Sequence, residues 1–140
     1  MQIKKLLGIL VLGLLWCNAG FAANFNWKKG AETFDGTSTW HYDKKTIFEV
    51  GGHKYFWQLT DYLDDDGTPI RSVITHSMVN CDTYKIRWIT YSGYSGQMGK
   101  GQIIDDVIIP EFDLENFKWT YYDPNKTSQG KILKKVCNSR

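Results

Sequence analysis

The fold of this chain is decided by residues 45–59, which read KTIFEVGGHKYFWQL. Two runs rich in β-branched and aromatic residues, 46–50 and 53–59, flank the pair Gly51-Gly52. Both glycines can adopt positive φ, as a primed two-residue turn requires. The stretch therefore predicts an antiparallel β-hairpin.

The turn also predicts the register of this hairpin. The expected cross-strand pairs are Val50–His53, Glu49–Lys54, Phe48–Tyr55 and Ile47–Phe56. They include one pair of opposite charges and two apolar pairs, and both kinds of contact stabilise antiparallel strands. A shift by one residue would separate these pairs, so we expect this register rather than a neighbouring one.

Further strands are expected on the C-terminal side of the hairpin. Alternating apolar and polar residues predict strands at 71–80, 84–91, 102–109 and 119–122. Within the second of these, Tyr84, Ile86 and Trp88 share a face that we expect to be buried, whereas Lys85 and Arg87 are expected to face water. The Gly-rich segment 92–101 is expected to be a flexible connection.

The last segment changes from strand to helical spacing. Ile132, Leu133 and Val136 recur at helical intervals, and Ser128 is a suitable N-cap. Gly130 in the first turn weakens the prediction of where the helix starts. A helix this short needs tertiary support, so we expect it to pack on the sheet.

Residues 1–22 have the three parts of a secretory signal peptide. Lys4 and Lys5 precede an apolar run, 6–16, and small residues stand before the expected cleavage site after Ala22. The run is too short to cross a bilayer comfortably, and no other segment predicts a transmembrane span. The exported chain is then a single domain, residues 23–140.

Removal of the signal peptide also removes Cys17 and leaves Cys81 and Cys137. An exported chain with one pair of cysteines predicts a structural disulfide, which would tie the terminal helix to the sheet. The alternative is lipid attachment at Cys17, but Leu15 and Trp16 fit that processing signal poorly. Loss of Lys4 and Lys5 also leaves 15 basic against 15 acidic residues, so charge gives no indication of nucleic-acid binding.

These features predict an α+β fold that is mainly β. We expect an antiparallel sheet of about five to six strands, with a short C-terminal helix docked by the disulfide. The high content of tryptophan and tyrosine is interpreted first as a β-protein core and second as an aromatic platform for a ligand.

No catalytic pattern stands out, and we expect neither enzymatic activity, nor a cofactor, nor a metal site. Asp64 to Gly67 does not match the ligand spacing of an EF-hand and is interpreted as a solvated turn, with ion binding left open. His41, His53 and His76 lie in three separate strand-like segments without the paired spacing of a zinc site.

The order of several motifs resembles the bacterial surface-adhesin protein E family. The residues that carry the resemblance are Trp40-His41-Tyr42-Asp43, Trp57-Gln58-Leu59-Thr60-Asp61, Cys81, Arg87, Tyr91-Ser92, Trp119, Pro124 and Val136-Cys137. The resemblance covers residues 25–138. It implies a curved antiparallel sheet with the helix tied to it, export in a Gram-negative bacterium, binding of extracellular-matrix or serum proteins, and a homodimer.

Two functions follow as hypotheses. The first is an exported binding module that acts as an adhesin on the outer-membrane surface, with its contacts in the region 87–100. The candidate binding residues are Arg87, Tyr91, Tyr94, Met98 and Lys100. The second is a periplasmic protein that binds a small ligand or maintains the envelope, which an apolar pocket with a few polar groups would favour.

Overall fold

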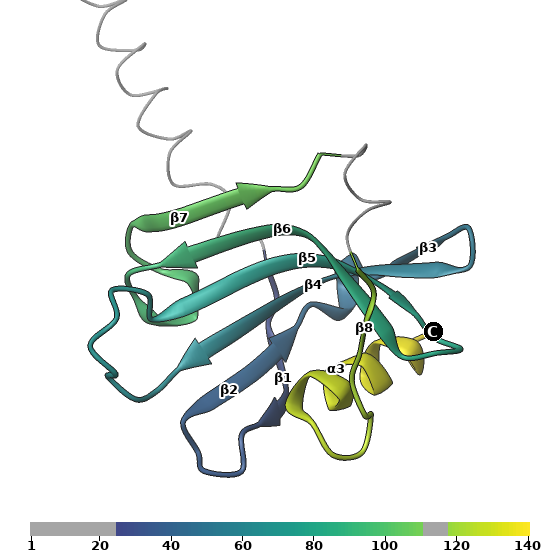
Figure 1. Cartoon of the computed structure of the whole chain (residues 1–140), viewed down its shortest axis with the longest axis horizontal. Helices are drawn as coiled ribbons and strands as arrows, with labels where there is room; N and C mark the ends of the chain where they lie inside the picture. The colour runs from purple at the N-terminus through teal and green to yellow at the C-terminus, as the bar shows by residue number, and fades with distance from the viewer. Residues whose placement is uncertain (1–24, 111–117) are drawn as a thin grey trace, which may run out of the picture.

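The computed structural model describes residues 25–110 and 118–140, which form an antiparallel sheet and a C-terminal helix (Figure 1). The strands are β1 (Lys28–Glu32), β2 (Ser38–Tyr42), β3 (Phe48–Val50), β4 (His53–Tyr62), β5 (Ser72–Asn80), β6 (Lys85–Tyr94), β7 (Ile103–Ile108) and β8 (Thr120–Tyr121). The helix is α3 (Ser128–Cys137), and two 3-10 turns are η2 (Lys44–Thr46) and η3 (Gln97–Gly99). The predicted signal peptide, residues 1–22, and Cys17 within it lie outside the described residues.

The strands are hydrogen-bonded in the order β1-β2-β4-β5-β6-β7, with β3 also paired to β4 and β8 also paired to β6. The sheet is open. The predicted class, a mainly β fold with one docked helix, is confirmed, but the described sheet has eight strands rather than five or six. The two additional strands are β1 and β2, a hairpin with a bulge between Lys29 and Ala31 that interrupts its alternation.

The hairpin at Gly51-Gly52 is confirmed, and both glycines have positive φ. The pairs Phe48–Tyr55, Glu49–Lys54 and Val50–His53 form as predicted. The fourth predicted pair is wrong, because Ile47 ends the turn η2 and does not join the ladder opposite Phe56.

The ammonium group of Lys54 binds the end of the terminal helix rather than the carboxylate of Glu49. Its Nζ donates to the carbonyl oxygens of Cys137 at 3.1 Å and Ser139 at 2.8 Å, with Val136 at 3.4 Å. These carbonyls lie at the negative end of the helix dipole, where a cation is favourable. The side chain therefore joins β4 to the end of α3.

The core lies between α3 and one face of the sheet, with buried members from β2, β4, β5 and β6. Its buried members are Tyr42, Phe56, Val79, Ile86, Ile132, Leu133 and Val136. The interpretation of the aromatic residues as core holds for Phe56 and Tyr42, which are buried, and in part for Trp40, which is half-buried and packs against this core. None of the described tryptophans is fully buried, and Trp88 is exposed.

Helix α3 begins at Ser128, one residue earlier than the predicted N-cap implies, because the N-cap is Thr127, whose side chain accepts from the backbone N–H of Gly130. A Cβ at Gly130 would collide with the backbone carbonyl of Asp123, which explains a glycine inside the first turn. The predicted disulfide joins Cys81 to Cys137, with the two Cα atoms 5.6 Å apart. Together with the apolar stripe of α3, it holds the helix against the sheet.

The Gly-rich segment 92–101, which the sequence predicts to be a flexible connection, ends strand β6 and then folds into the hydrogen-bonded turn η3. The backbone N–H of Met98 donates to Asp61 Oδ1 at 2.8 Å, and that of Gly99 donates to Ser72 Oγ at 2.9 Å. Gly99 has φ +71°, and a Cβ there would stand 2.7 Å from Ile74 Cδ1. The turn η3 is thus a folded cap on the face of β4 and β5 opposite α3.

Candidate surface along strand β6

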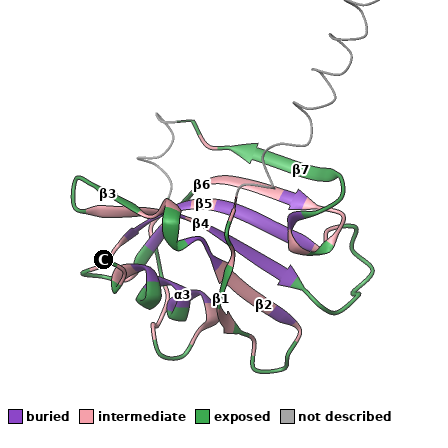
Figure 2. Ribbon diagram, turned by 180° about the vertical axis from the view of Figure 1, so that it is seen from behind, coloured by how far each residue is buried: buried purple, intermediate pink, exposed green. Residues whose placement is uncertain are grey.

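The side of the sheet that carries α3 is covered over only part of its width. Figure 2 shows buried residues concentrated on β4, β5 and the inner side of α3, whereas β7 is exposed along its length. Strand β6 lies at the boundary. Ile86 is 2% exposed, but Trp88, on the same face two residues later, is 41% exposed. The expectation that Trp88 is buried is therefore wrong, because the helix does not reach it.

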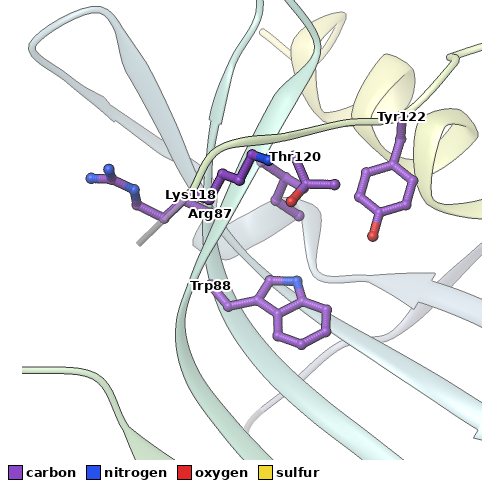
Figure 3. Close-up of a pocket in the computed structure, with 6 residues that line it drawn as sticks. Arg87, Trp88, Lys118, Thr120 and Tyr122 are labelled. Atoms are coloured by element: carbon purple, nitrogen blue, oxygen red, sulfur yellow. The ribbon is translucent and has the colours of Figure 1, made fainter. Parts of the chain in front are cut away.

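Trp88 borders a pocket at the junction of β6 and β8. The pocket encloses about 280 Å³ and is lined by Ile86, Arg87, Trp88, Lys118, Thr120 and Tyr122. Figure 3 shows the Trp88 and Tyr122 rings on one side of the strand, while the Arg87 side chain points away from them. Backbone pairing of Ile86 with Thr120 brings β8 to this position. Because Ile86, Trp88 and Tyr122 line it, the pocket is mainly apolar, and Lys118 adds a charged group to its lining.

Arg87 lies on the other face of β6 and is half-buried rather than fully solvated as predicted. Its guanidinium carbon is 4.7 Å from the centroid of the Trp119 ring, and that ring stacks on His53 at 5.2 Å. A cation over an indole ring is favourable, most of all where water is partly excluded. Arg87 and Trp119 therefore fasten β8 to the sheet.

Tyr91 continues the exposed line along β6. Its ring centroid is 6.5 Å from that of Trp88, and its cross-strand neighbour on β7 is Val107. Tyr91 also lines a second hollow of about 290 Å³ with Tyr62, Asp66, Thr68, Ile70 and Val73. Burial raises the pKa of both Tyr91 and Tyr62, so the two hydroxyls stay protonated at neutral pH. We call Trp88, Tyr91, Val107, Thr120 and Tyr122 the open surface.

The predicted binding residues do not converge on one point. Arg87 lies near one end of β6, while Tyr94, Met98 and Lys100 lie at the other end, around the turn η3. Seven residues of extended strand separate Arg87 from Tyr94, or roughly 23 Å. Of the five, Tyr91 belongs to the open surface, and Arg87 lines the pocket beside Trp88 although its side chain points to the other face of β6. Sequence reasoning missed Trp88, Thr120 and Tyr122 as surface residues.

The opposite face of the sheet carries an aromatic row that the sequence did not reveal. Successive ring contacts join Trp27, Phe25, Trp57, His76, Tyr55 and Phe48. His76 stacks on Trp57 with ring centroids 4.4 Å apart, and burial lowers the pKa of its imidazole. Because these rings mostly stack on one another, the row fastens the segment before β1 across β4.

Other candidate groups have local partners. Asp65 accepts from the backbone N–H of Gly67, and Asp66 accepts from Thr68, as in a solvated turn. Across the residues that the structure describes, no three histidine, cysteine, aspartate or glutamate side chains gather into a group that could hold a metal ion. In the same residues, no helix is long and apolar enough to cross a bilayer.

Comparison with known proteins identifies the family. A family model, surface-adhesin protein E, matches residues 27–138. A structure of Haemophilus influenzae protein E (crystal form II) is 14% identical with a TM-score of 0.51, covering 80% of this chain and 90% of that chain. A selenomethionine form of that protein is 15% identical with a TM-score of 0.49, covering 80% and 88%. No curated protein matches the chain. The resemblance found in the sequence is thus confirmed, and the first structure supports the fold.

Proposed function

The chain belongs to the surface-adhesin protein E family, and from this premise we propose that it is an exported adhesin that acts by binding a protein rather than by catalysis. The partner class that the family implies is an extracellular-matrix or serum protein. The contact region is the open surface along β6. The family also implies a homodimer, which light scattering of the purified chain tests.

The observation that carries this proposal is the exposure of Trp88 between two hollows. An indole that is 41% exposed on a sheet face, with Tyr91 and Tyr122 beside it, has the composition of a binding hot spot. Apolar surface of this kind on an exported domain marks a place where a partner removes water. The pocket beside Trp88 would take one apolar side chain of the partner.

The binding residues predicted from the sequence remain proposals, and they lie at different distances from Trp88. Tyr91 is part of the open surface and therefore of the proposed contact, whereas Arg87 reaches it only at the pocket that it lines with Trp88. Tyr94, Met98 and Lys100 lie at the far end of β6, so they contribute only if the partner spans the whole strand. Single alanine variants of Arg87 and Tyr94 separate the two ends.

The experiment is binding of the processed, disulfide-bonded chain to a panel of immobilised extracellular-matrix and serum proteins. Trp88→Ala is expected to weaken retention by about tenfold or more, as for a hot-spot aromatic residue. The matched control is Phe34→Ala, an exposed aromatic residue in the loop between β1 and β2. Equal retention of both variants, or retention by no member of the panel, would contradict the proposal.

The second candidate is a periplasmic protein that binds a small ligand, and the apolar pocket beside Trp88 favours it. Its volume of about 280 Å³ is close to the lower limit of small-molecule sites, about 300 Å³. Protease treatment of intact cells distinguishes the two. Release of peptides from residues 23–140 without lysis supports the adhesin, whereas protection until the outer membrane is opened supports the periplasmic protein.

A further inference from the structure

Strand β7 is the last strand of the sheet, and no described strand pairs with its outer edge. The backbone N–H of Ile109 donates to the carbonyl of Ile89 on β6 at 2.9 Å. Since successive backbone groups of a strand point in opposite directions, the N–H groups of Ile108 and Asp106 point away from β6. Within residues 25–110 and 118–140, the edge therefore presents backbone donors and acceptors that no strand uses.

The side chains of β7 are exposed on both faces of the sheet. The apolar ones are Ile103 at 56%, Ile104 at 43%, Val107 at 46% and Ile108 at 71%. An edge strand rich in β-branched apolar residues is a template for an added strand. Val107 lies directly opposite Tyr91, so a strand added at this edge extends the open surface.

The centre of β7 carries two exposed carboxylates, Asp105 and Asp106. Asp106 accepts a hydrogen bond from Ser92 Oγ at 2.7 Å, which holds one carboxylate on the edge of the sheet. If two copies of the chain joined through the full length of β7, antiparallel pairing would place these carboxylates opposite one another. Like charges directly across a ladder are destabilising, so the edge disfavours a second copy of itself.

We propose that the outer edge of β7 accepts an extended segment of the partner by β-strand addition. The segment has Lys or Arg at its centre, opposite Asp105 and Asp106, and β-branched apolar residues on either side. Backbone hydrogen bonds supply affinity in this mode, and the carboxylates supply selectivity. The inference rests on the proposed function and identifies the part of the partner that meets the sheet.

The probe is a synthetic peptide with the core Val-Ile-Lys-Lys-Ile-Val between Gly-Ser tails, labelled for fluorescence anisotropy. The matched control has Glu-Glu in place of Lys-Lys. The processed, disulfide-bonded chain is expected to bind the Lys-Lys peptide more tightly by on the order of tenfold, because two charge pairs form across the ladder. Absence of binding to the Lys-Lys peptide would overturn the proposal.

Two variants test whether the backbone edge makes the contact. Ile108→Pro removes an outward N–H and leaves the bonds to β6 in place, whereas Ile108→Ala removes the side chain and keeps the N–H. The proline variant is expected to bind the peptide about tenfold or more weakly than the alanine variant. If Ile108→Pro does not fold, the same test is made on the unaltered chain with a peptide whose backbone N–H groups facing β7 are N-methylated. This peptide is expected to bind more weakly than the unmethylated one.

The double variant Asp105→Asn with Asp106→Asn tests the charges. It is expected to lose the preference for Lys-Lys over Glu-Glu. If it instead forms oligomers and keeps the preference, the carboxylates serve only to prevent self-association and the proposal is wrong. The proposal is also wrong if the unaltered chain dimerises and Ile108→Pro makes it monomeric, because the occupant is then a second copy.

Failure of this inference differs from failure of the proposed function. If the immobilised proteins retain Ile108→Pro and Ile108→Ala equally but release Trp88→Ala, the adhesin proposal stands and strand addition at β7 is wrong. If none of the panel retains the chain, the proposed function fails whatever the peptide does.

Discussion

Ile86 and Trp88 lie two positions apart on β6 and point to the same face of the sheet, yet the first is 2% exposed and the second 41%. The first packs in the core beneath α3, and the second stands beyond the reach of the helix. Both are apolar residues at alternating positions. Alternation thus selects the face of a strand, while the element packed on that face decides whether the side chain is buried or displayed.

This contrast extends over the whole sheet (Figures 1 and 2). In the covered half, β2 and β4 pack with α3, and Phe56 and Leu133 are 0% exposed. In the open half, β7 is exposed along its length. We infer that the covered half carries most of the stability and that the open half is free to bind. The predictions below test this division, in order of decreasing effect.

The largest effect is expected from Phe56→Ala in the covered half. Removing a fully buried ring leaves a cavity, and such changes cost about 3–5 kcal/mol of unfolding free energy. Val107→Ala in the open half is the control, with an expected change within about 0.5 kcal/mol. Chemical denaturation measures both, and similar losses for the two variants would contradict the division.

The next effect is expected from loss of the Cys81–Cys137 bond. The bond closes a loop with a sequence separation of 56, for which chain entropy predicts a stabilisation of about 4 kcal/mol, with about 2–4 kcal/mol typical. We expect the double variant Cys81→Ser with Cys137→Ser to lose about 2–4 kcal/mol of unfolding free energy, measured by denaturant titration. A loss confined to α3, with the remaining sheet unaffected, would mean that the helix is dispensable for the covered half.

A smaller effect is expected from Lys54→Met. This change keeps much of the aliphatic stem and removes the ammonium that donates to the carbonyls of Cys137 and Ser139, at a cost of about 1 kcal/mol. Glu49→Gln is the control and is expected to change stability little, since no ion pair joins Glu49 to Lys54 in the described residues. If both variants lose the same unfolding free energy, Lys54 contributes through the predicted charge pair with Glu49 rather than through the helix carbonyls.

Acidification is expected to weaken the fold through its histidines. Burial lowers the pKa of His76 and of His41 below the ordinary value of 6.5. Below about pH 6.5 these imidazoles are protonated in the unfolded chain but stay neutral in the folded one, so the free energy of unfolding falls as the pH drops. We expect His76→Gln to flatten this fall in thermal melts between about pH 7 and 5. An unchanged slope would mean that His76 does not contribute.

The smallest effect on stability is expected from Trp88→Ala, within about 0.5 kcal/mol, although it is the change expected to weaken partner binding most. Thermal melting and retention on the immobilised partner are measured on the same sample. A loss of stability comparable to that of Phe56→Ala would place Trp88 in the core and remove the distinction between the two halves.

Much of the fold could be predicted from local signals. The Gly51-Gly52 turn, the helical spacing after Ser128 and the surviving cysteine pair each carry a short-range or pairwise constraint that the structure confirms. The turn η3 could not be predicted in this way. Its glycines indicate a loop, and the contacts that fold it come from Asp61 and Ser72, far away in the sequence.

The candidate surface was predicted less well for the same reason. Residue type alone indicates Arg87 and Tyr91; Tyr91 is part of the open surface, and Arg87 lines the pocket next to it. The alternation of its strand predicts a buried Trp88, and only the position of α3 shows that this side chain is uncovered. The contact of Arg87 with Trp119 depends on β8 pairing with β6, and neither alternation nor spacing indicates that pairing.

Native-state hydrogen exchange of the free chain tests the division of the sheet most directly. The comparison is between N–H groups that face a neighbouring strand, in β4 on one side and in β7 on the other. We expect the β4 amides to exchange only through global unfolding and the β7 amides to exchange much faster, through local opening. Equal protection in the two strands would contradict the account, because the open half would then be as firmly held as the covered half.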